Sequence, residues 1–594
     1  MHGATVTGQI EVDRPPANRR FLQAVTQAGP LVITAIGGLV CYGLFVRRGV
    51  WLSVVGYSVS PAERVLHGEI PYRDFLYNYT PGTLWINAFL MKVFAPTLLT
   101  VNLGVFAFKL ATLVMLFFIA KRLTSAWTAL VPVGLTLAWL GHRYIFGVVP
   151  TQYALFFVLA AISLMLSYNR TGRLGRLWLC GLAIGIVLIF KYNVGLLLLG
   201  AGTAAIALRQ VGAGIDASLT VRLVAAARHS AIYWAGFGLA VAALIGYMAA
   251  HDALGAMVNH FFNHAAEYSE ARAVALPHPK QLAPVAAGFL VSAILGWLVL
   301  RVAPSFLVVF ALLVLLLGCT ALVLPGRAYL LKLSALASVA YFPLVLFAAI
   351  AVLVLWPLYR RASEAEFRQM WWEQYGALII VALFTLGAYA EMYPRADFYH
   401  LVRVLPAVFL LFVVFLNLTL PSLTNYLRRY GPSPGRTAVV CWGVLIVLLV
   451  VAGAQNTWRP HFDARWNFRD SRPLSIERAR GVLVSARQAD FIEGMAREIE
   501  TRSTPDDYVF SFAQRGSGFY FLTGRRNPTR FVWWRSVGID AEDREAVLGM
   551  IAEKRPKLIL LQDSLSNTRV RETVTANYHP AAAVTDITIY ERIP

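Results

Sequence analysis

The segment PAERVLHGEIPYRDFLYNYTPG, residues 61–82, lies between two strongly apolar regions of the chain. It is polar and aromatic, and Pro61, Pro71 and Pro81 interrupt it. Irregular backbone of this kind is not tolerated in contact with lipid, because its N–H and C=O groups would lack hydrogen-bond partners. We therefore interpret the segment as part of a loop that meets water, where binding and catalytic residues are often found.

The composition around this loop is that of a membrane protein. The chain has 594 residues, of which 58% are hydrophobic and only 14% are charged, and its mean hydropathy is +0.59. A soluble protein carries about a quarter charged residues. Many apolar runs approach the roughly 20 residues that a helix needs to cross a bilayer. The sequence predicts a polytopic α-helical membrane protein with about 13 transmembrane helices.

The formal net charge of +21 does not indicate nucleic-acid binding. The basic residues cluster at the ends of apolar runs, and no compact basic domain is present. This distribution follows the positive-inside rule and suits contact with anionic membrane lipids. It predicts a multi-pass membrane protein with its N-terminus in the cytoplasm.

Composition also predicts the domain boundaries. We expect a cytoplasmic tail over residues 1–30 and a membrane domain over residues 31–454. Within the latter, residues 47–100 form the first extracytoplasmic loop, and residues 83–94 are an amphipathic helix too short to span. Residues 455–594 have the composition of a soluble domain, with short strands expected at 508–512, 557–562 and 587–593. We predict a small α/β domain on the extracytoplasmic face.

The helix-rich layout and the loop sequence together resemble the C-type (GT-C) glycosyltransferases that use polyprenyl-phosphate sugars. This superfamily includes the protein O-mannosyltransferases and the lipid A aminoarabinose transferase. The matching motifs are AERVLHGE at 62–69, PYRDF at 71–75 and the pair Pro81-Gly82. The resemblance in layout covers nearly the whole chain, whereas the distinctive motif covers about twenty residues. It implies a transferase embedded in the bacterial cytoplasmic (inner) membrane, with a polyprenyl-phosphate-linked sugar donor and an envelope lipid, glycan or protein as acceptor.

One position departs from the family pattern. Relatives usually carry an acidic pair before Gly-Tyr, and its first acid is generally taken as the catalytic base. This chain instead has Val54-Val55 before Gly56-Tyr57. Glycosyl transfer needs a carboxylate to take the acceptor proton, so we expect Asp74 to act as the base of an inverting displacement. The alternatives are a non-catalytic envelope-assembly protein that retains the fold, and a transporter or flippase for lipid-linked glycans.

The departing phosphate needs cations. Arg73, Lys191 and Arg395 are the candidates, because guanidinium and ammonium groups both bind phosphate. The competing interpretations are that Arg73 and Asp74 only fix the loop, that Lys191 only reaches the interface, and that the turn at Arg395 is merely salt-bridged. The remaining candidates, for binding the sugar or the acceptor, are Tyr72, Tyr79, Asp397 and His400.

The loop after residue 250 contains a weak metal-binding pattern. His260, His264 and Glu267 would share one face of a helix, and two histidines with a carboxylate can bind zinc. Interfacial histidines and aromatic residues are commoner on such helices. We therefore expect no required cofactor, with a divalent metal as the less favoured alternative.

Overall fold

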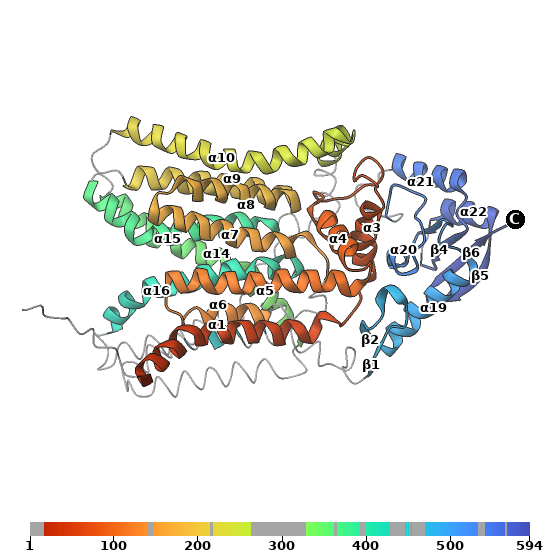
Figure 1. Ribbon diagram of the computed structural model, residues 1–594, viewed down its shortest axis with the longest axis horizontal. Coiled ribbons are helices and arrows are strands. Elements are labelled where there is room, and N and C mark those ends of the chain that lie inside the picture. Colours follow the sequence, from red (N-terminus) through yellow and green to blue (C-terminus); the bar gives the residue numbers. More distant parts are fainter. Residues whose placement is uncertain are drawn as a thin grey trace, which may run out of the picture.

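The computed structural model describes residues 17–139, 147–213, 218–262, 328–361, 365–392, 398–427, 470–532, 541–564 and 567–594, and a few positions between 443 and 453. These residues form a bundle of long, nearly parallel helices and a smaller C-terminal region packed against one end of it (Figure 1). Two short helices of the first loop, α3 and α4, lie between the two parts. The first loop is thus enclosed on both sides.

The bundle is built from apolar helices. Eight helices of the described residues are long and apolar enough to cross a membrane, and two shorter ones, α6 and α8, accompany them. The helices of the bundle are α1 (Ala17–Val46), α5 (Leu98–Leu123), α6 (Leu130–Trp139), α7 (Pro150–Thr171), α8 (Leu174–Phe190), α9 (Tyr192–Ala213), α10 (Leu219–Ala250), α14 (Ala328–Arg361), α15 (Ala365–Tyr389) and α16 (Phe398–Leu427). The chain is a multi-pass membrane protein.

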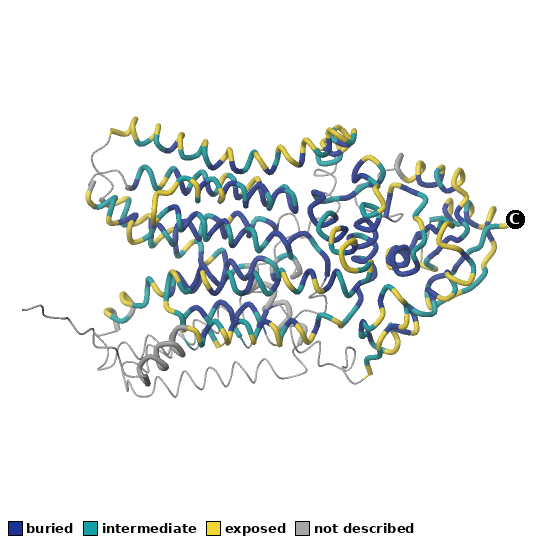
Figure 2. The backbone as a smooth tube through the Cα atoms, viewed as in Figure 1, coloured by how far each residue is buried: buried dark blue, intermediate teal, exposed yellow. Residues whose placement is uncertain are grey.

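The outer surface of the bundle is apolar, as contact with lipid requires. Helix α10 has exposed residues along its whole length (Figure 2), and the large apolar side chains of Leu223, Trp234 and Leu239 are among them. In water such a surface would favour association, whereas in a bilayer it is the expected lipid-facing side. The helices at the centre of the bundle, by contrast, are largely buried.

The first loop is mostly helical. It contains α2 (Leu52–Val54), the π-helix η1 (Val55–Val59), α3 (Ser60–Leu66) and α4 (Gly82–Val93). Helix α4 buries Leu84, Ala88 and Met91 and exposes Phe89 and Val93, so it is apolar on both sides. The predicted short helix at 83–94 is therefore present, and its exposed apolar side is suited to the membrane interface.

The C-terminal region is a small α/β unit. A four-stranded sheet has the order β3-β4-β6-β5, in which β3 pairs parallel with β4 and the other pairs are antiparallel. All three predicted strands are found, as β3 (Val509–Ser511), β4 (Leu558–Gln562) and β6 (Ile587–Arg592). The other elements are β1 (Ser471–Pro473), η7 (Glu477–Ala479), β2 (Leu483–Ser485), α19 (Ala486–Arg502), α20 (Gly518–Thr523), α21 (Ala541–Lys554), α22 (Thr568–Asn577) and β5 (Tyr578–Val584).

Three of the predicted membrane spans, at residues 282–300, 305–324 and 437–454, lie wholly or largely outside the described residues. The expected total of about 13 spans therefore stays a prediction. Arg122, in the last turn of α5, and Arg173, just after α7, lie at the end of the bundle opposite the first loop. This separation is the one that the positive-inside rule requires of the predicted orientation.

Candidate active site

A buried ion pair lies where the bundle meets the first loop. The Lys191 amine, just after α8, is 2.6 Å from the Oε1 atom of Glu391, in the short helix η4 (Ala390–Met392) after α15. The Thr151 hydroxyl, in the first turn of α7, donates a 2.6 Å hydrogen bond to the same oxygen. The side chains of Lys191 and Glu391 are only 7% and 3% exposed. Three chain segments therefore meet at one polar point inside an apolar bundle.

Three tyrosines cover this point from the first loop. The rings of Tyr57, Tyr77 and Tyr79 lie 5.6 to 6.0 Å from one another, and the Lys191 amine is 5.9 Å from the centre of the Tyr79 ring. The hydroxyls of Ser58 and Thr83 lie beside that of Tyr77. All three hydroxyl oxygens are buried without a well-formed hydrogen bond. The interior beneath the loop is thus aromatic and supplied with polar groups, as sugar-binding sites commonly are.

Two further cations lie in the same part of the bundle. Lys109, on α5, is 4% exposed, and its amine is 5.5 Å from the centre of the Tyr42 ring. Arg403 lies on α16, which packs against α5 and α7. Neither was identified from the sequence. A single cation inside an otherwise apolar run is the signal that could have drawn attention to them.

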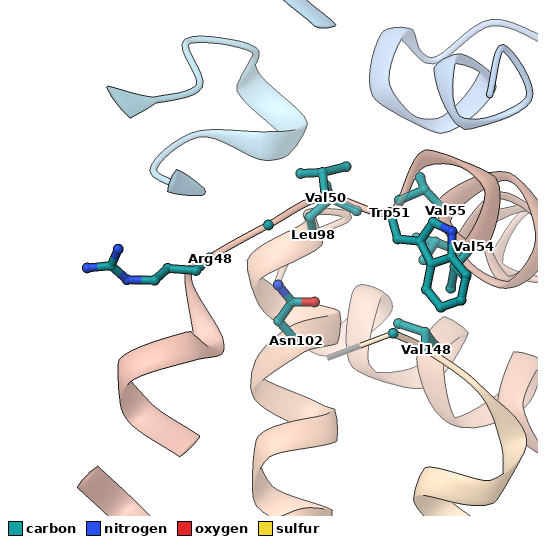
Figure 3. A pocket seen from close by; sticks show the side chains of 11 residues that line it. Arg48, Val50, Trp51, Val54, Val55, Leu98, Asn102 and Val148 are labelled. Atoms are coloured by element: carbon teal, nitrogen blue, oxygen red, sulfur yellow. The ribbon is translucent and has the colours of Figure 1, made fainter. Parts of the chain in front are cut away.

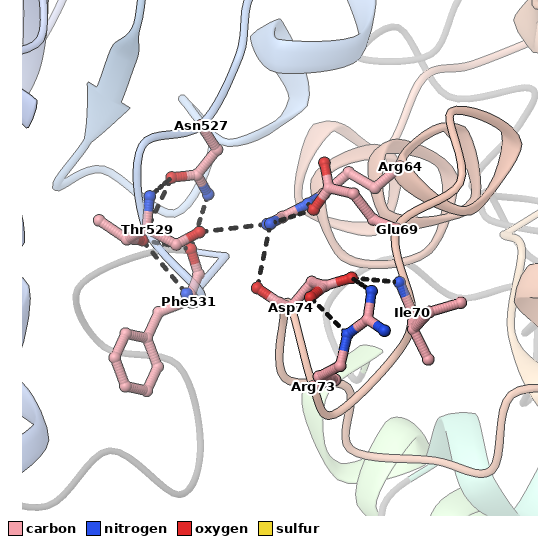
Figure 4. Close-up of polar contacts among 8 residues, drawn as sticks. All are labelled: Arg64, Glu69, Ile70, Arg73, Asp74, Asn527, Thr529 and Phe531. Carbon is pink, nitrogen blue, oxygen red and sulfur yellow. Dashed lines mark hydrogen bonds and ion pairs between the residues drawn. The ribbon is translucent and has the colours of Figure 1, made fainter. Parts of the chain in front are cut away.

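The predicted catalytic base is held in a different arrangement (Figure 4). Asp74 accepts two hydrogen bonds of 2.8 Å from the Arg73 guanidinium and one of 2.7 Å from the Ile70 N–H. The Arg73 guanidinium holds the pKa of the Asp74 carboxyl below its usual value. Among the described residues, no contact joins Asp74 to Lys191 or Glu391. The structure therefore brings Arg73 and Asp74 together but places them apart from Lys191.

Two tyrosines predicted to bind sugar or acceptor are in direct contact. The Tyr72 hydroxyl donates a 2.5 Å hydrogen bond to the Tyr79 carbonyl oxygen. Tyr72 is fully buried and has a φ of 70°, in the left-handed region that a bulky residue seldom adopts. Its ring packs against Phe261, at the end of the described part of the segment that follows α10. The loop is therefore folded back on itself over Lys191.

The remaining predicted site residues are only partly described. Arg395, Asp397, His264 and Glu267 lie outside the described residues, while His400 is half-buried in the first turn of α16 and His260 packs near Tyr72. Within the described ranges, no three His, Cys, Asp or Glu side chains gather in a way that could hold a metal ion. The predicted zinc alternative thus rests on residues that the structure leaves out.

Val54 and Val55, where relatives carry acids, line an apolar pocket. It is partly open and lies between the end of α1, the first loop and the start of α5 (Figure 3). Trp51, Leu98 and Val148 also line it, and none of its lining residues is acidic. The π-helix η1 begins at Val55, and π-helical turns often mark functional sites. This pocket cannot supply a carboxylate.

The C-terminal region fastens the first loop. Arg478 forms an ion pair with Glu63 on α3 and also donates a 2.9 Å hydrogen bond to the Phe521 carbonyl. Arg64 donates to the Thr529 carbonyl at 3.1 Å and to Glu69 at 2.7 Å (Figure 4). Burial raises the pKa of the Glu63 carboxyl, and the Arg478 charge opposes that effect. The region thus acts as a clamp on the loop that covers Lys191.

The first loop and helix α20 of the C-terminal region also lie very close to each other at two glycines. A Cβ atom on Gly56 would lie 2.0 Å from the Ser517 Oγ atom, and one on Gly518 would lie 2.6 Å from the Leu52 carbonyl oxygen. Both positions therefore require glycine for space. The sequence Gly516-Ser517-Gly518 does not form a nucleotide-binding turn; it is the contact surface between α20 and the first loop.

No protein-family model matches the chain, and no curated protein sequence matches it. Solved structures do. ArnT from Cupriavidus metallidurans bound to undecaprenyl phosphate superposes with a TM-score of 0.50 at 14% identity, covering 95% of this chain and 98% of ArnT. The apo form of the same protein gives 0.48 at 13% identity and covers 97% and 99% of the two chains. The oligosaccharyltransferase of Archaeoglobus fulgidus with Zn and sulfate gives 0.44 at 13% identity, covering 95% and 73%. At 14% identity, the superposition with ArnT shows that the two chains share a fold.

Proposed function

We propose that this protein is a membrane glycosyltransferase that moves a sugar from a polyprenyl-phosphate carrier to an envelope acceptor outside the cytoplasm. The observation that carries the proposal is the buried Lys191–Glu391 pair beneath the tyrosine-lined first loop. Support also comes from the fold, which is shared with ArnT, a protein solved with undecaprenyl phosphate bound. Buried, paired charges at the end of a membrane bundle are a common sign of a functional site.

The reaction is one displacement with inversion at the sugar carbon. The acceptor oxygen forms a bond to the anomeric carbon while the bond from that carbon to the phosphate oxygen breaks. The electron pair of the broken bond remains on the phosphate, and the acceptor proton passes to a carboxylate. Lys191 stabilises the charge that grows on the phosphate, and the covering loop keeps water out.

Glu391 is the carboxylate best placed for the proton. It touches Lys191, the proposed phosphate contact, whereas Asp74 is held by Arg73 and Ile70 in the described structure and has no contact with Lys191. A phosphate that binds Lys191 would compete for its amine and so release the Glu391 carboxylate. We therefore assign the base to Glu391 and give Asp74 and Arg73 the task of fixing the loop.

The predicted roles of Tyr79, Arg395, Asp397 and His400 are kept, whereas Tyr72 becomes a positioning residue instead of a binding one. Tyr79 stacks near Lys191 and presents an aromatic face to a sugar ring, and Tyr72 holds Tyr79 in place through its hydrogen bond. Arg395 is proposed as a second phosphate contact, and Asp397 and His400 as partners of sugar or acceptor hydroxyls. These three follow directly on Glu391 in the chain or begin the next helix, α16.

Purified protein tests the proposal directly. With a panel of polyprenyl-phosphate sugars and an envelope extract as acceptor, the wild type should release polyprenyl phosphate. Glu391→Gln should reduce release by about 10²–10⁴-fold, the usual contribution of a general base, while donor binding persists. No release with any donor, together with normal donor binding, would favour a non-catalytic assembly protein, the alternative that Val54 and Val55 suggest. Movement of intact donor across a vesicle membrane would favour a flippase.

A further inference from the structure

A second polar cluster lies at the end of the bundle opposite the first loop, where α7 and α9 end and α10 begins (Figure 1). The Tyr168 hydroxyl, near the end of α7, is 2.5 Å from the Nδ1 atom of His229 on α10. The Gln210 amide, on α9, donates to the Tyr168 oxygen at 3.0 Å and lies 2.6 Å from the same histidine nitrogen. Three helices therefore meet at a polar point that the proposed reaction does not use.

Arg209 is held over Tyr168 in this cluster but is not neutralised. Its guanidinium carbon is 4.7 Å from the centre of the Tyr168 ring, and its Nη1 atom donates a long hydrogen bond of 3.4 Å to the Tyr168 oxygen. That oxygen also accepts from Gln210 and has only one proton to give to His229, so its capacity is used up. The Arg209 Nε–H is buried and has no acceptor among the described residues.

Arg222 reaches the end of α9 from the neighbouring helix α10. It lies seven residues before His229, so the two side chains share one face of α10. The Arg222 Nη1 atom donates a 3.0 Å hydrogen bond to the Val211 carbonyl in the last turn of α9, two residues after Arg209. The Arg222 Nε–H is also buried without an acceptor in the part of the chain that the structure describes. Two half-buried arginines from adjacent helices thus each keep a donor unused.

No carboxylate compensates these two arginines. Within the described ranges, neither Arg209 nor Arg222 makes an ion pair. Residues 168–176 and 209–229 together contain six arginines and one acidic residue, Asp216, which lies outside the described residues. Buried donors are nearly always paired in proteins, so the unused ones point to an acceptor that the chain does not supply. Phosphate suits them, because a guanidinium group binds it through two parallel N–H donors.

The surface beside the arginines is apolar and exposed. Large exposed side chains flank both arginines in the sequence: Leu208, Leu219, Val221, Leu223 and Val224. An exposed apolar surface of this kind is the side of the bundle expected to face lipid. A molecule with an anionic head and apolar chains would contact both the arginines and these side chains, whereas a soluble anion would contact the arginines alone.

We propose that Arg209 and Arg222 bind the phosphate of an anionic phospholipid in the leaflet at this end of the bundle. The head group contacts the two guanidinium groups, and the acyl chains lie along α10. Basic pockets between transmembrane helices bind anionic lipid head groups in this way. The proposal does not depend on the transferase function, because Arg209 is about 27 Å from Lys191 along α9.

Lipid binding to the purified full-length protein tests the site. The protein in detergent is titrated with phosphatidylglycerol or with phosphatidylcholine of the same acyl chains, and native mass spectrometry counts the bound lipids. The first phosphatidylglycerol should bind about tenfold or more tightly than phosphatidylcholine, and an equal concentration of inorganic phosphate should not displace it. Equal affinities for the two lipids would overturn the proposal. Displacement by inorganic phosphate would also overturn it, because the ligand would then be a soluble anion.

Variants assign the preference to the two arginines. Arg209→Gln and Arg222→Gln should each lower phosphatidylglycerol affinity about tenfold or more and change phosphatidylcholine affinity little. The matched control is Arg122→Gln, which removes the same charge from an exposed position on α5 at the same end of the bundle. A loss in the control as large as that in the two cluster variants would overturn the proposal, because it would indicate a diffuse basic surface.

The two lipids together distinguish loss of the site from misfolding. Misfolding would lower the affinity for both lipids, whereas loss of the head-group contact removes only the preference for phosphatidylglycerol. An unchanged preference in both glutamine variants would overturn the assignment. Should a glutamine variant fold poorly, Arg209→Lys keeps the charge but loses the two-point geometry, so it should still show a reduced preference. A wild-type protein without any preference would overturn the proposal whatever the variants do.

Discussion

The Lys191 amine lies 2.6 Å from the Glu391 Oε1 atom, in a region where both side chains are almost completely buried. The two residues are far apart in the chain: Lys191 follows α8, and Glu391 lies in η4 after α15. The contact between them therefore depends on how these helices pack. Burying two charges costs solvation that their mutual attraction only partly returns. A pair of this kind is therefore poor evidence for stability alone and good reason to look for a function.

Removal of one partner should be more harmful to stability than removal of both. Lys191→Met leaves the Glu391 carboxylate buried without its cation and should destabilise the protein by about 3–5 kcal/mol. The double variant Lys191→Met/Glu391→Leu replaces the pair by apolar side chains and should recover most of that loss. Thermal unfolding in detergent measures the effect. A double variant as unstable as the single one would contradict the account.

Asp74→Asn should have a small effect on stability and on turnover. The side chains of Arg73 and Asp74 are 44% and 29% exposed, and partly exposed ion pairs contribute up to about 1 kcal/mol. Since Glu391 is assigned as the base, turnover should stay within about tenfold of wild type. Steady-state release of polyprenyl phosphate measures it. Loss of activity as large as that of Glu391→Gln would return the base to Asp74.

The ionised Asp74 carboxylate should keep the first loop protected from hydrogen exchange until the pH falls below the usual pKa of an aspartate. Arg73 holds the pKa of this carboxyl below its usual value of about 3.9. A lowered folded-state pKa contributes stability that is fully present above the unfolded value and is lost as the pH falls through the folded value. Hydrogen exchange of the Ile70 N–H, which donates to Asp74, should therefore be slow from pH 7 to 5 and accelerate only below about pH 4.

The control for that measurement is the Leu76 N–H. It donates to the Arg530 backbone carbonyl, a group that does not titrate. After correction for intrinsic rates, its protection should change less than that of Ile70. A parallel loss at both positions would indicate that the whole loop opens, not that Asp74 is protonated.

The clamp should depend on small residues at its contact. Gly56→Ala adds a Cβ atom 2.0 Å from the Ser517 hydroxyl oxygen, and overpacking of this kind typically costs about 1–3 kcal/mol. Ser517→Gly removes that hydroxyl and should restore part of the loss in the double variant. Gly549→Ala, on α21 with no neighbouring atom within 4 Å, is the matched control. Limited proteolysis of the C-terminal region reports release of the clamp, and unchanged cleavage in Gly56→Ala would argue against it.

The Arg478–Glu63 pair should link loop and C-terminal region energetically. Arg478→Met leaves Glu63, whose side chain is 11% exposed, without its cation, and should loosen the C-terminal region. Glu63→Gln removes the carboxylate charge and should be milder. A double-mutant cycle should give a coupling of about 0.5–3 kcal/mol. Additive effects of the two substitutions would mean that the pair does not hold the clamp.

The sequence allowed most helices and strands to be predicted, but not which residues distant in the chain come into contact. Apolar runs of the right length predicted the helices, and alternating basic clusters predicted which ends lie together, because bilayer thickness and charge impose both. The three strands of the C-terminal sheet also followed from their β-branched and aromatic composition. Each of these features depends on residues that are close together in the sequence.

The site depends on contacts that no local pattern encodes. Lys191 was identified because it ends an apolar span, but its partner Glu391 is brought to it only by the packing of α15 against α9. Lys109 and Arg403 each stand alone in an apolar run, and only the fold packs their helices, α5 and α16, against each other. In the same way, Arg73 lies beside Asp74 in the chain, but only the structure shows that its guanidinium donates a hydrogen bond to each of the two Asp74 carboxylate oxygens.

The most direct test of the central claim compares three proteins in one assay. Wild type, Glu391→Gln and Asp74→Asn are supplied with the same labelled polyprenyl-phosphate sugars and envelope extract, and release of polyprenyl phosphate is followed over time. We expect release by the wild type, release within about tenfold of it by Asp74→Asn, and a loss of at least about 10² in Glu391→Gln with donor binding preserved. Release by Glu391→Gln at the wild-type rate would contradict the claim that the Lys191–Glu391 pair is the reaction centre.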